Sequence, residues 1–175
     1  IRGLLLMALS NKYGSMLLTT GNKSEIAVGY STIYGDMCGG YNPVKDLYKT
    51  RLYSICEWRN SHHEAWMKGP NGLVIPKNIL EKSPTAELRP NQTDQDSLPP
   101  YEVLDSILES LIENDMPVSE IVEQGHDYNL VKKIEKLVYQ SEYKRFQSAP
   151  GVHLTKKSFQ LSRRYPIVQN WRDKL

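Results

Sequence analysis

Apolar residues recur at helical spacing in several separate stretches of the chain, and each stretch predicts a helix. The clearest runs from Tyr101 to Glu113, with apolar residues at i, i+3 and i+4: Val103, Leu104, Ile107, Leu108, Leu111 and Ile112. Similar patterns predict helices over residues 2–13, 47–60, 118–124 and 128–140. We expect the apolar faces of the helices over residues 101–113 and 128–140 to lie in the core.

A different pattern occupies residues 16–30. A short apolar run, Met16 to Thr19, predicts a buried strand, the polar residues Thr20 to Asn22 predict a turn, and Lys23 to Tyr30 predict a helix. Helix, strand and helix in this order are typical of an open α/β sheet, in which ligands bind beyond the carboxyl ends of the strands. Free N–H groups and the dipole at the start of such a helix favour a phosphate or a carboxylate.

The remaining segments show little periodicity. Residues 31–46 are rich in Gly, Tyr, Asn and Pro and predict a loop close to this turn, whereas residues 61–99 hold many prolines and predict a long irregular segment. The tail from Ser148 to Leu175 mixes Arg, Lys, Tyr and Pro, and we expect it to extend over the surface.

Composition narrows the class of protein. The 175 residues, 39% of them hydrophobic, suffice for one domain or part of one, and the start at Ile1 in helical apolar material favours a C-terminal piece of a larger protein. Cys38 and Cys56 have neither metal nor redox spacing, and no apolar run spans a bilayer, so we expect a cytoplasmic protein. A net charge of +2 does not support binding to nucleic acid or to a membrane.

Five ordered blocks carry a family resemblance: TTGNKSE at 19–25, YGD at 34–36, NPVKDLYKT at 42–50, SPTAEL at 83–88 and EYKR at 142–145. With these blocks the chain resembles the synthetase part of glutamine-dependent NAD synthetase over nearly its whole length. The resemblance implies an adenine-nucleotide α-hydrolase-like three-layer α/β fold with a parallel sheet. Residues 1–175 would be the largely helical C-terminal part of this ATP pyrophosphatase-type domain.

The resemblance also implies a reaction: ATP-dependent amidation of deamido-NAD to NAD through an adenylated nicotinate, with Mg²⁺ and with ammonia that the complete enzyme takes from glutamine. It further implies a homo-oligomer with a dimeric core. Two alternatives stay open. One is a related ATP-dependent amidotransferase that acts on another carboxylate, and the other is a non-catalytic nucleotide-binding module.

Site residues follow from the resemblance position by position. It implies ATP contacts for Thr20, Lys49 and Thr85, deamido-NAD contacts for Glu25, Tyr30, Lys144 and Arg145, and a Mg²⁺ contact for Glu25. Each residue also has a plain structural interpretation. The threonine and the glutamate suit the start of a helix, the tyrosine suits a core, and basic residues suit a solvated surface or the end of a helix.

Other polar clusters are weaker candidates. Residues 92–96, Gln-Thr-Asp-Gln-Asp, resemble an acidic loop that we expect to be mobile and to close over the site. Arg163 and Arg164 favour surface or subunit contacts. The His62-His63-Glu64 run lacks further ligands at suitable spacing, so we do not expect a metal there.

The chain also departs from the family pattern. The phosphate-binding loop SGGxDS and the glutaminase domain are absent from the 175 residues, so we expect the chain by itself to be inactive. Ammonia-dependent relatives carry Lys and Asp where this chain has Ile33 and Gly40. This difference favours the glutamine-dependent branch of the family.

Overall fold

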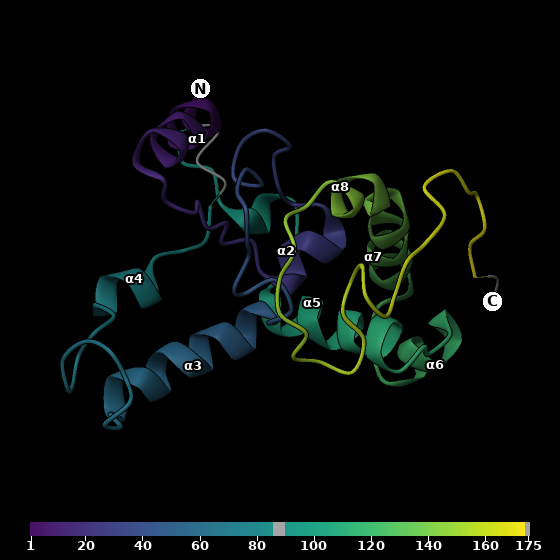
Figure 1. Cartoon of the computed structure of the whole chain (residues 1–175). Coiled ribbons are helices and arrows are strands. Elements are labelled where there is room, and N and C mark those ends of the chain that lie inside the picture. Colours follow the sequence, from purple (N-terminus) through teal and green to yellow (C-terminus); the bar gives the residue numbers. More distant parts are fainter. Residues whose placement is uncertain (86–89, 174–175) are drawn as a thin grey trace.

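The computed structural model describes residues 1–85 and 90–173 and is largely helical (Figure 1). Its helices are α1 (Arg2–Tyr13), α2 (Lys23–Val28), α3 (Lys49–Ser61), α4 (Lys77–Glu81), α5 (Tyr101–Leu108), α6 (Val118–Glu123), α7 (Tyr128–Gln140) and α8 (Glu142–Phe146), with a 3-10 turn η1 (Asp94–Asp96) and a π-helical turn η2 (Glu109–Glu113). Within the described residues, no helix is long and apolar enough to span a membrane.

The core lies where α2, α5 and α7 meet, with α6 and α8 against α7 (Figure 1). Ala27 of α2, Leu104 and Ile107 of α5, and Ile134 of α7 are fully buried. The helix predicted from Tyr101 to Glu113 is confirmed, but it widens into the π-helical turn from Glu109 onward. The apolar stripes of α5 and α7 therefore mark faces that pack together, whereas those of α1 and α3 remain largely exposed.

Helix α2 begins and ends by local chemistry. At its start the side chain of Asn22 accepts from the N–H of Glu25 at 3.0 Å, and the Glu25 carboxylate accepts from the N–H of Asn22 at 3.1 Å. At its end Gly29 adopts a left-handed conformation with φ of 71°, where a Cβ would collide with Ser141. The helix predicted to reach Tyr30 therefore stops at Val28.

The strand predicted from Met16 to Thr19 is reduced to a single parallel bridge between Leu18 and Tyr41. Two hydrogen bonds flank this bridge, from Thr19 N to Tyr41 O at 2.9 Å and from Gly40 N to Leu17 O at 2.8 Å. A strand needs a paired neighbour along its length, and the described residues supply only this short partner. A parallel sheet is therefore not formed by the described part of the chain.

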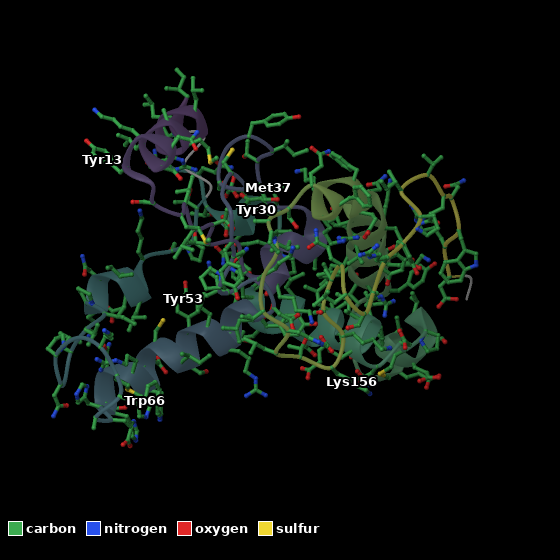
Figure 2. All side chains as sticks on the ribbon, viewed as in Figure 1. Tyr13, Tyr30, Met37, Tyr53, Trp66 and Lys156 are labelled. Atoms are coloured by element: carbon green, nitrogen blue, oxygen red, sulfur yellow. The ribbon has the colours of Figure 1, made fainter. Side chains whose placement is uncertain are left out.

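Two segments stand away from the core (Figure 1). Helix α1 buries only Gly3, and α3 buries none of its residues. Figure 2 shows Trp66 near the far end of the α3–α4 arm, and its side chain is 78% exposed. The segment predicted to be irregular, residues 61–99, contains α4 and η1.

The C-terminal tail also differs from its prediction. It contains no helix among residues 148–173, as expected, but it does not simply cover the surface. Ala149, Ser158 and Phe159 are buried. Residues 149–160 therefore belong to the folded body of the protein.

Candidate functional site

An open cleft of about 760 Å³ gathers the residues that the sequence motifs single out. Its lining includes Thr20, Glu25, Tyr30, Lys49, Thr85 and Lys144, which are all of the predicted site residues except Arg145. They come from separate segments: the turn before α2, the two ends of α2, the start of α3, the segment before η1, and α8. A cleft of this size accommodates a nucleotide-sized ligand.

Glu25 and Lys49 form an ion pair at the wall of the cleft. Lys49 Nζ lies 3.0 Å from Glu25 Oε1, and the two side chains are 16% and 18% exposed for the lysine and the glutamate. The ammonium group also lies 5.3 Å from the centre of the Tyr101 ring. One positive and one negative group thus face the same ligand space and remain accessible from solvent.

A buried carboxylate fixes the elements that carry this pair. Asp105 of α5 accepts a hydrogen bond from the Ser24 hydroxyl, and it accepts from the N–H and the hydroxyl of Thr50 at 2.9 and 2.8 Å. Burial raises the pKa of Asp105, and the hydrogen bonds from Ser24 and Thr50 oppose that rise. Ser24 directly precedes Glu25, and Thr50 directly follows Lys49. This carboxylate therefore fixes the start of α2 relative to the start of α3.

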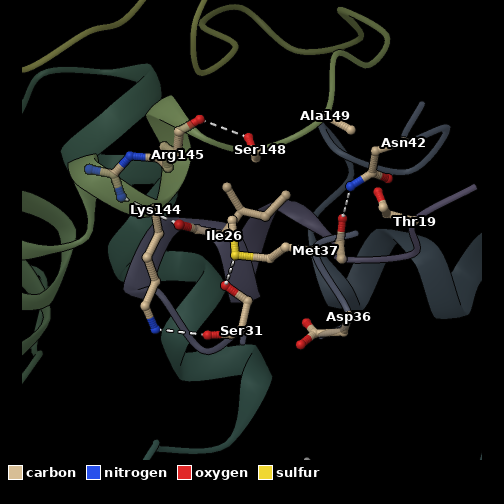
Figure 3. Close-up of a pocket in the computed structure, with 11 residues that line it drawn as sticks. Thr19, Ile26, Ser31, Asp36, Met37, Asn42, Lys144, Arg145, Ser148 and Ala149 are labelled. Atoms are coloured by element: carbon tan, nitrogen blue, oxygen red, sulfur yellow. Dashed lines mark hydrogen bonds between the residues drawn. The ribbon is translucent and has the colours of Figure 1, made fainter. Parts of the chain in front are cut away.

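Lys144 reaches the cleft from α8. Its Nζ donates to Gly29 O at 2.7 Å and to Ser31 O at 2.8 Å, which ties α8 to the end of α2. Figure 3 shows the bond to Ser31. The side chain is half-buried, and it lines both the cleft and a small adjoining pocket. Among the described residues its hydrogen-bond partners are these two neutral carbonyls, which leave the positive charge free to attract an anionic ligand.

Arg145 has a different environment from its neighbour. Its side chain is 1% exposed, and its guanidinium donates to Ala27 O at 2.6 Å, to Glu142 at 2.9 Å and to Val138 O. Burial lowers the pKa of Arg145, and the Glu142 carboxylate opposes this effect. The geometry therefore favours a structural role for Arg145, whereas the motif predicted a substrate contact.

Asp94 lines the cleft and was not identified from the sequence beyond its place in an acidic loop. It is 3% exposed, and its Oδ2 accepts from the Tyr101 hydroxyl at 2.5 Å, whereas its Oδ1 has no hydrogen-bond partner among the described residues. Burial first and the Asp94 carboxylate second raise the pKa of Tyr30. The Gln-Thr-Asp-Gln-Asp segment was the only signal in the sequence that could have found it.

Metal binding has a limited basis in the protein side chains. Within residues 1–85 and 90–173, no three His, Cys, Asp or Glu side chains are arranged to hold an ion together. His62 instead stacks on Trp58, with ring centroids 5.2 Å apart. Glu25 fits as a single carboxylate ligand, because Mg²⁺ is commonly held by one or two carboxylates together with substrate phosphates.

The fold matches solved synthetases. A glutamine-dependent NAD(+) synthetase from Cytophaga hutchinsonii superposes with a TM-score of 0.70 at 23% identity, covering 96% of this chain and 27% of that one. An NMN synthetase from Francisella tularensis gives 0.61 at 25% identity, with 82% and 50% covered. The chain therefore shares its fold with these solved synthetases.

Sequence comparison identifies the family. The NAD synthase family model matches residues 1–148, and the chain belongs to this family. It is 65% identical to a glutamine-dependent NAD(+) synthetase from Rhodobacter capsulatus over 99% of its length, and 50% identical to one from Thermotoga maritima over 100%. The chain spans 31% and 29% of the lengths of these two relatives.

Proposed function

We propose that this chain forms the substrate-binding part of a glutamine-dependent NAD synthetase, an ATP-dependent ligase that amidates deamido-NAD. The observation that carries the proposal is the convergence of Thr20, Glu25, Tyr30, Lys49, Thr85 and Lys144 on one cleft. The motifs selected these residues without reference to their positions in space. Their meeting in one cleft supports a shared ligand site.

The reaction has two steps. First, the nicotinate carboxylate attacks the α-phosphate of ATP and pyrophosphate leaves, which produces an acyl adenylate. Then ammonia attacks the acyl carbon, AMP leaves with the carbon–oxygen bond electrons, and the nitrogen loses a proton to give the amide. The first step brings a carboxylate against the ATP phosphates, and the second releases anionic AMP, so the site must supply positive charge and exclude water.

The residues of the cleft suit this demand. Lys49 would neutralise ATP phosphates while Thr20 and Thr85 donate hydroxyl hydrogen bonds on the ATP side. Lys144 would face the acidic substrate from α8, and the Tyr30 ring offers a surface on which the nicotinate ring stacks. Bound Mg²⁺ would supply phosphate charge neutralisation, and Glu25 is the residue that would hold it.

Several features of the complete protein belong to the same proposal. The rest of a longer chain would provide the phosphate-binding loop, the remaining strands of a three-layer parallel sheet and the glutaminase domain. The assembly would be a cytoplasmic homo-oligomer. The relatives' greater length supports the additional domains, and the exposed α1 face supports a packing partner inside that larger assembly.

The decisive experiment uses the complete enzyme with Mg-ATP, ammonium or glutamine, and a panel of carboxylate acceptors that contains deamido-NAD and nicotinate mononucleotide. We expect NAD to form from deamido-NAD with the highest kcat/KM in the panel. A preference for the mononucleotide would favour the related amidotransferase. The structural similarity to an NMN synthetase is the observation that supports this alternative. Nucleotide binding without any amide product would favour the binding module.

A further inference from the structure

Lys23, in the first turn of α2, lies at the centre of a buried ion cluster that the proposed chemistry does not use. Its side chain is 0% exposed, and its Nζ lies 2.9 Å from Asp46 and in contact with Glu113. The same ammonium group contacts the Thr155 hydroxyl and donates to the carbonyl oxygen of Lys157 at 2.8 Å. A lysine buried this deeply needs all of these partners.

The C-terminal tail also satisfies the two carboxylates. Asp46 Oδ2 accepts from the N–H groups of Leu154 and Thr155, each at 2.7 Å, and from the Thr155 hydroxyl at 2.8 Å. Glu113 Oε2 accepts from Lys157 N at 2.7 Å. Burial would raise the pKa of Asp46, but the hydrogen bonds from Lys23 and from the tail lower it overall. The tail therefore completes the cluster.

Residues 149–160, which we call the C-terminal brace, make further contacts with the same body. The carbonyl of Ala149 accepts from Lys45 Nζ at 2.5 Å, and the Phe159 ring lies 4.7 Å from the Arg145 guanidinium. Gln160 Nε2 donates to Arg145 O at 2.5 Å. The NAD synthase family model ends at residue 148, whereas curated relatives align across the brace.

A short path leads from the brace to the cleft. Lys23 and Glu25 are two residues apart in one helical turn, and the Lys23 N–H donates to Leu47 O at 2.8 Å, just before the start of α3. Helix α2 has six residues, too few to be stable without tertiary contacts. Whatever fixes Lys23 therefore also fixes the turn that presents Glu25 to Lys49.

We propose that the C-terminal brace orients the Glu25–Lys49 pair, with Thr155 and Lys23 as positioning residues for the reaction. Thr155 does not line the cleft, and it joins the tail to both Lys23 and Asp46 through one hydroxyl. The inference rests on the proposed function, because it assigns the brace to that site. It makes the tail a requirement for turnover as well as for folding.

The test compares two substitutions of Thr155 in the complete enzyme. Thr155→Val keeps the shape and removes the hydroxyl, whereas Thr155→Ser keeps the hydroxyl. Ser158→Ala is the matched control, because it removes a buried hydroxyl of the brace that has no hydrogen-bond partner among the described residues. Measurements are kcat, KM for each substrate, the Mg²⁺ concentration for half-maximal rate, and the unfolding midpoint.

We expect Thr155→Val to lower kcat by about tenfold at a temperature where the enzyme is folded, since small displacements of a reacting site have large effects on rate. It should also raise the Mg²⁺ requirement. Thr155→Ser should restore both quantities to within about twofold of the wild type, and Ser158→Ala should leave them unchanged. A Thr155→Val enzyme with a lower unfolding midpoint but wild-type kcat and Mg²⁺ dependence would overturn the proposal.

A second measurement separates this inference from the proposed function. Hydrogen exchange of residues 22–28 should be faster in Thr155→Val than in Thr155→Ser, even if the wild type makes no NAD. Unchanged exchange would contradict the coupling between brace and α2. If Thr155→Val does not fold, Gln160→Met loosens the brace away from the ion cluster, and it should lower kcat in the same direction. A wild-type kcat in that variant would count against the proposal.

Discussion

The first turn of α2 carries two charged side chains that face different environments. Lys23 points into the core, where it is 0% exposed beside Asp46 and Glu113. Glu25, two residues later, points to the cleft, where it pairs with Lys49 and keeps 18% of its side-chain surface exposed. Both residues belong to ion pairs, but only one pair can be reached by a ligand.

This difference teaches what each pair can do. A buried charge that loses a partner has no water to replace it, so the inner cluster holds the fold in one arrangement. The Glu25–Lys49 pair keeps part of its surface in contact with solvent, so it contributes less to stability than an enclosed pair and rearranges more easily, which allows Lys49 to exchange Glu25 for a phosphate. One helical turn thus has a structural face and a ligand-binding face.

The largest effect should come from breaking the inner cluster. Lys23→Met leaves Asp46 and Glu113 buried without their cation, and we expect the free energy of unfolding to fall by about 3–5 kcal/mol. Denaturant unfolding of the complete protein measures this. Lys77→Met is the control, because the Lys77–Glu81 pair is 81% and 63% exposed and its loss should be nearly neutral. Equal losses of unfolding free energy in the two variants would show that the buried cluster contributes no more to stability than the exposed pair.

Breaking the outer pair should affect activity more than stability. Glu25→Gln keeps the size of the side chain and an acceptor for the Asn22 N–H, but it removes the charge. We expect kcat/KM to fall by about a hundredfold or more, with a loss of stability of about 1 kcal/mol or less. Glu102→Gln, at an exposed position in the first turn of α5, is the control. Steady-state kinetics that leave Glu25→Gln at wild-type activity would remove Glu25 from the site.

Two lysines that donate to carbonyl groups, one in the cleft and one outside it, allow a sharper comparison. Lys144→Ala removes a cation that donates to the carbonyl groups of Gly29 and Ser31, and we expect KM for deamido-NAD to rise by about tenfold with the fold intact. Lys133→Ala is matched to it, since Lys133 Nζ also donates to a carbonyl, that of Ser97 at 2.8 Å, but outside the cleft. Similar KM values in both variants would show that Lys144 serves packing alone.

The smallest effect concerns Lys45, a buried lysine with no carboxylate in contact among the described residues. Burial lowers its pKa to about 8, so the folded protein binds fewer protons than the unfolded chain between pH 8 and 10. The contribution of Lys45 to stability therefore rises with pH across this window, on the order of 1 kcal/mol. Denaturant unfolding of the wild type and of Lys45→Met at pH 7.5, 8.5 and 9.5 measures this. The free energy of unfolding of the wild type, relative to that of Lys45→Met, should increase with pH. A difference in unfolding free energy between the two proteins that does not change with pH would contradict the lowered pKa of Lys45.

The sequence predicted some elements well because their signals are local. The apolar stripes of α5 and α7 define amphipathic helices, and their core residues Leu104 and Ile134 are fully buried. The strand predicted from Met16 to Thr19 is only a single bridge in the structure, because a short apolar run does not reveal whether a paired neighbour exists. The end of α2 was missed by two residues, since Gly29 was counted inside the helix instead of at its cap.

The site was predicted through motif resemblance, and the structure added what resemblance does not carry. Asp94 was overlooked, because nothing local distinguishes a buried aspartate from its exposed neighbours in a polar segment. Arg145 and Lys144 are adjacent and equally basic, yet the first is buried against carbonyl groups and the second reaches the cleft. Their roles depend on which way each side chain leaves α8.

By itself the sequence indicated the longer helices, the family resemblance and six of the residues that line the cleft, because periodicity and short motifs are properties of neighbouring positions. Only the tertiary structure decided which charges are enclosed. Lys23 meets Glu113 and Thr155 across 90 and 132 positions of the chain, and no local pattern encodes such a meeting. Burial removes water from a charge only after distant segments have packed, so the division of α2 into a structural and a ligand-binding face arises at that level.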